Sequence, residues 1–148
     1  KVAPKYEYVA TLDSKTTPIC QRLDGQQFEY NKGPTPPQHF NCRSTTVPVV
    51  DFDGLQEKYP GLEKPPETAL DTRPSMTGRV PQGQAYGDWL LNQKKELQIK
   101  TLGNEQRVRF FKTLAGKKGS SGQKALRQII RSDGTEKTLD QIKKEYKL

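Results

Sequence analysis

The stretch Tyr6-Glu7-Tyr8-Val9-Ala10-Thr11 decides the fold of the N-terminal part of this chain. Tyr6, Tyr8 and Ala10 occupy every second position, and this period of two is typical of a β-strand with one buried face. The sequence Leu23-Asp24-Gly25 predicts a turn, because glycine accepts a positive φ at no steric cost. Residues 26–30 follow it directly and can return as the hairpin partner of the first strand.

A further strand is predicted over residues 45–50, which are mostly β-branched and apolar. Pro48 within this strand cannot donate a backbone hydrogen bond, so the strand belongs at a sheet edge. A stiff, extended connection, Gly33-Pro34-Thr35-Pro36-Pro37, separates it from the hairpin. We therefore expect residues 1–50 to form a small antiparallel β-rich module.

Residues 51–85 carry no clear periodicity. Tyr59-Pro60-Gly61, Lys64-Pro65-Pro66 and Arg73-Pro74 would each interrupt a helix. We expect a long Pro-rich loop or arm, since loops of this length inside a compact domain are uncommon and usually bind something. The alternative is a segment that stays disordered until it meets a partner.

Residues 86–148 are predicted to form a group of short helices. The first carries an apolar stripe, and Gly103-Asn104 predicts its end and the cap of a second helix. Ser120 with Gln123, and Thr138 with Gln141, fit capping boxes that open two more. The stripe consists of Tyr86, Leu90, Gln93, Leu97 and Thr101, and Trp89, Phe110 and Phe111 are expected in the core. The fold class is therefore α+β, with a β module, an arm and a helical region.

The positive charge of the chain lies in its last third. Residues 1–93 hold ten Lys or Arg and eleven Asp or Glu, whereas residues 94–148 hold fifteen and six. This excess suggests contact with a nucleic acid, without sequence preference, or with an acidic protein surface. The alternative is a set of solvated helix faces. The candidate contact residues are Lys94, Lys95, Arg107, Arg109, Lys112, Lys117, Lys118, Lys124, Arg127 and Arg131.

Cys20, His39 and Cys42 form the sharpest chemical cluster. Two thiolates and one imidazole are three of the four ligands that zinc prefers, and Asp13 or Asp24 could supply the fourth. The spacing lacks a Cys-x-x-Cys knuckle, so we favour the simpler interpretation, in which His39 and Cys42 stabilise the turn after Pro37 and no cofactor is bound. A Cys20–Cys42 disulfide is the weaker choice if the chain is cytosolic.

Enzymatic use of these cysteines would need a thiolate beside a base, and His39 is the only histidine. Because nothing in the sequence resembles a nucleophile-bearing helix start, a non-enzymatic protein is expected. No run of about 18 apolar residues occurs, and no secretory leader, so no membrane association is expected. The chain begins at Lys1 and its only methionine is Met76, which predicts a processed form or part of a longer protein.

Two longer motifs resemble a known family. Asp13 to Cys20, Leu23-Asp24-Gly25 and Pro36-Pro37-Gln38-His39-Phe40-Asn41-Cys42-Arg43 resemble the signature of the phage Mu F-like minor head proteins, also called phage head morphogenesis proteins. Tyr86-Gly87-Asp88-Trp89-Leu90 and the last helix resemble the C-terminal segment of the same family, so the chain corresponds to the C-terminal half of a family protein. The signature residues are Asp13, Thr16, Cys20, Asp24, Gly25, Pro37, His39, Asn41, Cys42, Arg43 and Trp89.

The resemblance implies a structural role in a virion. Such proteins associate with the portal vertex of a tailed phage and assist head assembly and the packaging or delivery of DNA. The implied partners are the portal protein, the major capsid protein, copies of the chain itself and packaged DNA. Some members carry further cysteines where this chain has Thr17 and Ser44, which weakens the case for a four-thiolate zinc site here.

Overall fold

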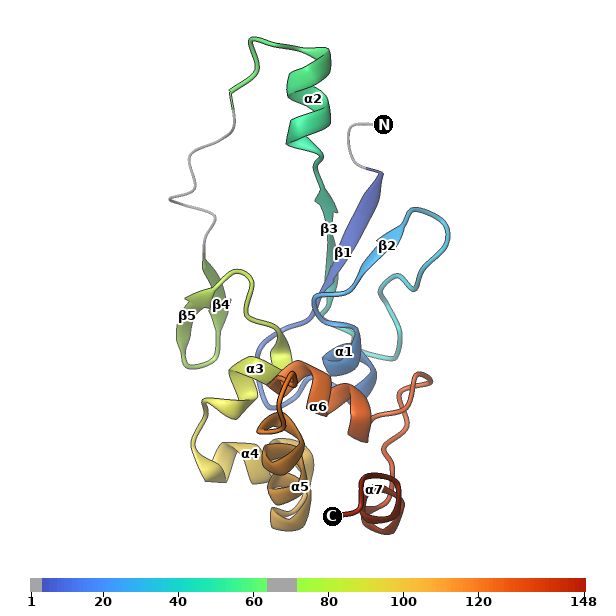
Figure 1. Ribbon diagram of the computed structural model, residues 1–148, viewed down its shortest axis with the longest axis vertical. Helices are drawn as coiled ribbons and strands as arrows, with labels where there is room; N and C mark the ends of the chain where they lie inside the picture. The colour runs from blue at the N-terminus through green and yellow to red at the C-terminus, as the bar shows by residue number, and fades with distance from the viewer. Residues whose placement is uncertain (1–3, 64–71) are drawn as a thin grey trace.

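The computed structural model describes residues 4–63 and 72–148. Its N-terminal sheet consists of β1 (Lys5–Val9), β2 (Gln27–Glu29) and β3 (Thr45–Val49), antiparallel and in the order β2-β1-β3 (Figure 1). Tyr6 lies opposite Phe28 on one side and Pro48 on the other. The predicted alternation and the edge position of Pro48 are therefore confirmed, since β3 has a partner on one side alone among the strands of residues 4–63 and 72–148.

A short helix that the sequence did not predict, α1 (Pro18–Leu23), lies between β1 and β2. Proline is well suited to the first position of a helix, because its missing N–H would have no intrahelical partner there. The helix turns Cys20 and Leu23 toward the sheet, where they pack with Tyr8 and Ala10 as a small core. β1 and β2 pair as predicted, but the connection between them is a helix and a turn and not a simple hairpin.

The prediction of an arm without regular structure over residues 51–85 is wrong in the part that the structure describes. Helix α2 (Phe52–Lys58) begins after Asp51, whose carboxylate accepts a hydrogen bond from the Gly54 amide. Strands β4 (Thr72–Ser75) and β5 (Gly78–Pro81) form a hairpin. The prolines allow both elements, because Pro60 follows the end of α2 and Pro74 lies in a two-stranded ribbon. The predicted breaker Lys64-Pro65-Pro66 lies outside the described residues.

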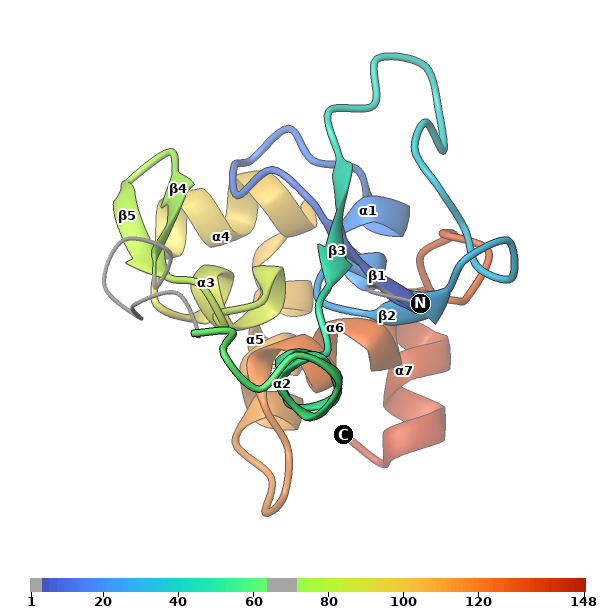
Figure 2. The ribbon, with the colours of Figure 1, turned by 90° about the horizontal axis from the view of Figure 1, so that it is seen from above.

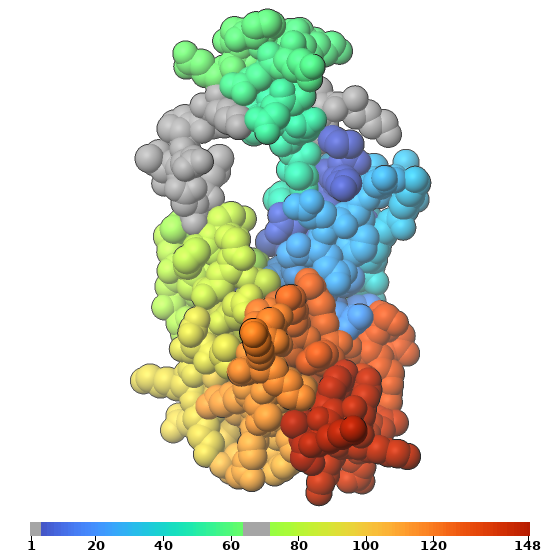
Figure 3. All heavy atoms as spheres, in the orientation of Figure 1, coloured from blue at the N-terminus to red at the C-terminus, as the bar shows by residue number. Residues whose placement is uncertain are grey.

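Helix α2 is unlike the other helices because none of its residues is buried. Figure 1 shows it away from the helical body, joined to the sheet through β3, and in the view from above (Figure 2) it is the helix nearest the viewer, in front of the helical body. In the space-filling view it lies at the end of the molecule opposite α5 and α7 (Figure 3).

The C-terminal region contains α3 (Tyr86–Leu91), α4 (Lys95–Leu102), α5 (Glu105–Ala115), α6 (Gly122–Ile129) and α7 (Leu139–Tyr146). The predicted single stripe from Tyr86 to Thr101 is split between α3 and α4. The break is stabilised by Gln98, which is fully buried and donates its side-chain amide to the Leu90 and Leu91 carbonyls at the end of α3. These terminal carbonyls would otherwise lack partners.

Two of the three predicted helix boundaries are confirmed. Gly103 ends α4 with φ +100°, and Asn104 caps α5 by accepting from the Arg107 amide. Thr138 and Gln141 form the predicted capping box of α7. The box predicted at Ser120 is wrong: Ser121 caps α6, and Gln123 is used elsewhere.

The main core lies among these helices. Trp89 and Phe111 are fully buried and Phe110 nearly so, as predicted. Leu12, from the N-terminal module, is part of the same cluster. Helices α3 and α6 approach closely at Gly87 and Gly122, where a Cβ on either glycine would lie 2.4 Å from the other's carbonyl oxygen. None of the helices described is long and apolar enough to cross a bilayer.

Candidate functional site

Cys20, His39 and Cys42 meet at one place on the N-terminal module. The Cys20 Sγ lies 3.3 Å from His39 Nε2 and 3.8 Å from the Cys42 Sγ. The three candidate ligand atoms lie within 4.8 Å of one another. Helix α1 supplies the first, and the loop between β2 and β3 supplies the other two. Asp13 and Asp24, predicted as fourth ligands, do not join this cluster, because both carboxylates bind arginines.

The hydrogen bonds of His39 fix the roles of its ring nitrogens. Nδ1 lies 2.9 Å from the Phe40 carbonyl oxygen, which can only accept, so Nδ1 carries the proton. In the neutral ring, Nε2 is then left with a lone pair directed at the sulfur of Cys20. This arrangement suits an imidazole that coordinates a metal ion, since such ligands usually donate their second N–H to a carbonyl or carboxylate.

The two sulfur atoms differ in environment. Burial acts to raise the pKa of Cys42, but hydrogen bonds from the Gln38 and Ser44 backbone and from the Cys20 and Ser44 side chains together outweigh it and lower that pKa to about 6. Cys20 is 1% exposed. The Tyr8 hydroxyl lies 3.4 Å from the Cys20 sulfur and 3.9 Å from that of Cys42. Burial raises the pKa of Tyr8, and hydrogen bonding to Cys20 adds to the shift, so the phenol stays protonated beside the sulfurs.

The cluster is poorly arranged for nucleophilic catalysis. Contrary to the prediction, Cys20 does lie in the first turn of a helix, α1, but its burial keeps substrates away from its sulfur. Cys42 is partly exposed, yet His39 is placed against Cys20. The geometry therefore favours coordination over catalysis.

A second group of signature residues closes the loop that carries His39. The Asp13 carboxylate receives two hydrogen bonds from the Arg43 guanidinium, at 2.5 and 2.9 Å, and others from the Lys15 and Thr16 amides. The hydrogen bonds from Arg43 lower the pKa of Asp13 more than its partial burial raises it. The Tyr86 hydroxyl donates to the Asp13 backbone carbonyl, so the residues around the Asp13–Arg43 pair are also bonded to α3.

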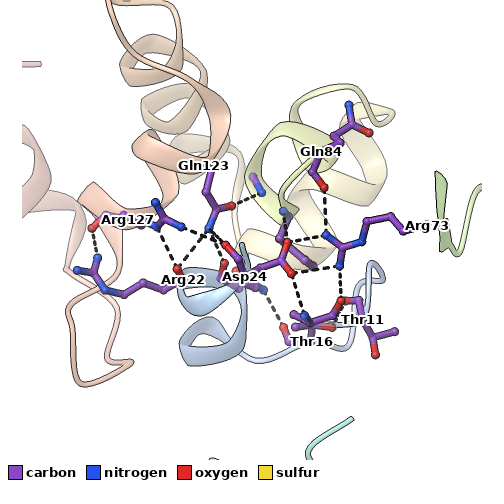
Figure 4. Close-up of polar contacts among 12 residues, drawn as sticks. Thr11, Thr16, Arg22, Asp24, Arg73, Gln84, Gln123 and Arg127 are labelled. Atoms are coloured by element: carbon purple, nitrogen blue, oxygen red, sulfur yellow. Dashed lines mark hydrogen bonds and ion pairs between the residues drawn. The ribbon is translucent and has the colours of Figure 1, made fainter. Parts of the chain in front are cut away.

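A third group of contacts centres on Asp24, which is fully buried. Figure 4 shows these contacts. Its carboxylate accepts hydrogen bonds from the amides of Ala10 (2.8 Å) and Tyr86 (2.7 Å) and from both terminal nitrogens of Arg73 (2.9 and 3.1 Å). Arg73 also donates to the Ala10 and Gln84 carbonyls. The single carboxylate thus joins the residues that follow β1 and α1 to the β4–β5 hairpin and to α3.

Gln123 extends this network to α6. Its side-chain oxygen accepts from the Gly87 amide at 2.6 Å, and its side-chain nitrogen donates to the Gln21 carbonyl at 2.8 Å (Figure 4). Sequence reasoning missed both Arg73 and Gln123. Arg73 stood beside a proline in a segment without periodicity, and Gln123 was assigned to a cap, so only the tertiary fold reveals their roles.

Three further signature residues have backbone roles. Gly25 has φ +80° and Asn41 has φ +61°, and Pro37 follows a cis peptide bond after Pro36. Left-handed φ values favour glycine and, among other residues, asparagine. The turn predicted at Gly25 is confirmed.

The predicted basic contact residues separate into two groups. Arg107 is buried and donates to the Lys137 carbonyl, while Arg127 donates to the Arg22 and Asp24 carbonyls and Arg131 to the Glu136 carbonyl. These three arginines stabilise the fold. The other seven are exposed, namely Lys94, Lys95, Arg109, Lys112, Lys117, Lys118 and Lys124, although Lys95 pairs with Glu105.

The model of one protein family, described as Phage Mu protein F like protein, matches residues 1–47. This span contains Asp13, Asp24 and the Cys20, His39 and Cys42 cluster, so the resemblance to the phage Mu F-like family drawn from the sequence is confirmed there. No curated protein and no solved structure matches the chain. The match points to a phage head morphogenesis protein with a structural role, and to a component of the virion.

Proposed function

We propose that this protein is a structural minor component of a tailed-phage head, placed at the portal vertex, where it assists head assembly and the packaging or delivery of DNA. The observation that carries the proposal is the family match over residues 1–47. The matched residues include β1, α1, β2, the start of β3 and the Asp13–Arg43 pair, and they include Asp24, whose partner Arg73 lies outside the match. Such a rigid module suits a part held between larger subunits.

The exposed apolar side chains around α2 support a role in docking. Tyr59 is 55% exposed and Leu62 is 38% exposed, and α2 itself buries no residue. In a protein with so few hydrophobic residues, uncovered side chains of this kind are suited to a partner surface. We infer that the segment formed by residues 52–62 contacts the portal protein, the major capsid protein or another copy of the chain.

The first test is to locate the protein. Mass spectrometry of purified virions and proheads should detect it, and a density map of the head should show it at the portal vertex. Its absence from both particles would refute the proposal.

The second test addresses docking. The double variant Tyr59→Ser/Leu62→Ser should lose co-sedimentation with the portal protein of the same phage. Met76 is also exposed (53%) but lies on the β4–β5 hairpin, so Met76→Ser is the matched control and should still co-sediment. Equal binding by all three proteins would argue against contact through residues 52–62.

A second candidate function, sequence-independent nucleic-acid binding, is favoured by the seven predicted contact residues of the helical region that are exposed. Affinity for duplex DNA should fall steeply with salt. The Lys117→Ala/Lys118→Ala variant should reduce the slope of log K against log salt concentration by about 2, or about 0.9 for each lost phosphate contact. The control variant Lys15→Ala/Lys32→Ala should leave the slope unchanged. A flat salt response of the wild-type protein would exclude this function.

A further inference from the structure

We propose that Cys20, His39 and Cys42 bind one zinc ion, with a water molecule beside Thr17 as the fourth ligand. The donor set is the kind that zinc prefers, two sulfurs and one imidazole nitrogen. All three donor atoms already converge within 4.8 Å. The inference is independent of the role of the protein in the virion.

The distances agree with coordination better than with a disulfide. With Zn–S bonds of about 2.3 Å, two thiolates on a tetrahedral zinc ion lie about 3.8 Å apart. The Cys20 and Cys42 sulfurs are 3.8 Å apart. The bonded sulfurs of a disulfide are about 2.05 Å apart, and both cysteines are free here.

The groups around the donor atoms fit the same interpretation. Because His39 donates from Nδ1 to the Phe40 carbonyl, its Nε2 lone pair is available beside the sulfurs. The Tyr8 hydroxyl can donate a hydrogen bond to a coordinated thiolate. Both cysteines would coordinate as thiolates, and the resulting Zn²⁺ site with two thiolates would carry no net charge.

The fourth position is argued from Thr17. Its hydroxyl oxygen is buried and has no hydrogen-bond partner within the described chain. A small cavity of about 10 Å³ is lined by Thr17, Cys20 and His39, among others. A space of this size is close to what one water molecule needs. Water held there would satisfy the Thr17 hydroxyl and complete the tetrahedron.

The ion would fix the exposed loop onto the module. His39 and Cys42 lie in the loop between β2 and β3, and Phe40 between them is 91% exposed. Coordination to Cys20 of α1 would hold this loop, and with it Phe40, in one position.

The test measures metal in the whole chain, purified under reducing conditions and freed of any histidine tag. After incubation with zinc chloride and desalting, elemental analysis should give one zinc per chain. Cobalt in place of zinc should give the visible absorption of tetrahedral cobalt with thiolate ligands. Excess zinc should raise the melting temperature by about 5 °C or more at 100-fold the Kd.

His39→Ala and Cys42→Ser should lose the metal and the cobalt spectrum. The control is Gln38→Ala, in the same loop, whose side chain bonds the Thr35 carbonyl and should keep both signals. Because Cys42 is only partly buried, Cys42→Ser should stay folded, which circular dichroism would verify. A wild-type chain that retains no zinc, variants that still bind it, or a Cys20–Cys42 disulfide in protein from a reducing cytosol would overturn the proposal.

Discussion

The strongest prediction concerns the Asp24 carboxylate, which we expect to be the most sensitive polar group of the fold. Asp24→Asn keeps the shape of the side chain but removes its charge and replaces one acceptor oxygen by an NH₂ donor. That donor would face either an N–H group or the Arg73 guanidinium, because all four hydrogen bonds run toward the carboxylate. Arg73 would then keep a buried positive charge without its counterion.

The magnitude follows from the burial of both partners. The Asp24 side chain is 0% exposed and that of Arg73 is 7% exposed, so solvent cannot replace the lost interaction. Breaking one side of such a buried pair costs about 3–5 kcal/mol. A domain of this size is stable by roughly 5–15 kcal/mol, so the variant should lose a large share of its stability.

Urea unfolding followed by circular dichroism would measure this loss. The control is Asp51→Asn, because Asp51 is an exposed N-cap of α2 and asparagine caps helices about as well as aspartate. Arg73→Met and the double variant with Asp24→Asn complete a double-mutant cycle. Its coupling energy should be at least about 2 kcal/mol, as expected for residues in one buried network. A loss below about 1 kcal/mol for Asp24→Asn would refute the reasoning.

Three further predictions concern other contacts of the structure. Gln123→Leu should destabilise the protein by about 1–3 kcal/mol in urea unfolding, because it leaves the buried Gly87 amide unpaired. An unchanged free energy of unfolding would contradict this role of the Gln123 side chain. Gly87→Ala should lower the free energy of unfolding by about 1–3 kcal/mol, because its Cβ would lie 2.4 Å from the Gly122 carbonyl oxygen. The control Gly83→Ala, whose Cβ would meet open space, should change the free energy of unfolding by less than about 0.5 kcal/mol. In metal-free protein the alkylation rate of Cys42 should rise with pH through an inflection near pH 6, because the lowered pKa makes the thiolate the main form above that pH. Cys20 should react slowly because it is buried. An inflection above pH 8 for Cys42 would contradict the hydrogen bonds that lower its pKa.

Signals that act within a few residues were readable from the sequence. The alternation of Tyr6, Tyr8 and Ala10 gave β1, and the Thr138–Gln141 box gave the start of α7. These features depend on backbone sterics and on hydrogen bonds between near neighbours, so their outcome is the same in most tertiary contexts. The cluster of Cys20, His39 and Cys42 was also predictable as a set, although its geometry was not.

The tertiary structure alone decided which polar groups meet. Asp24 pairs with Arg73, 49 positions further along the chain, and Gln123 bridges α1 and α3. Arg107 was predicted to face a partner, yet it is buried and bonded to the Lys137 carbonyl. The pairing of a charged side chain depends on which surfaces are brought together when distant segments pack, and a linear sequence does not hold that information locally.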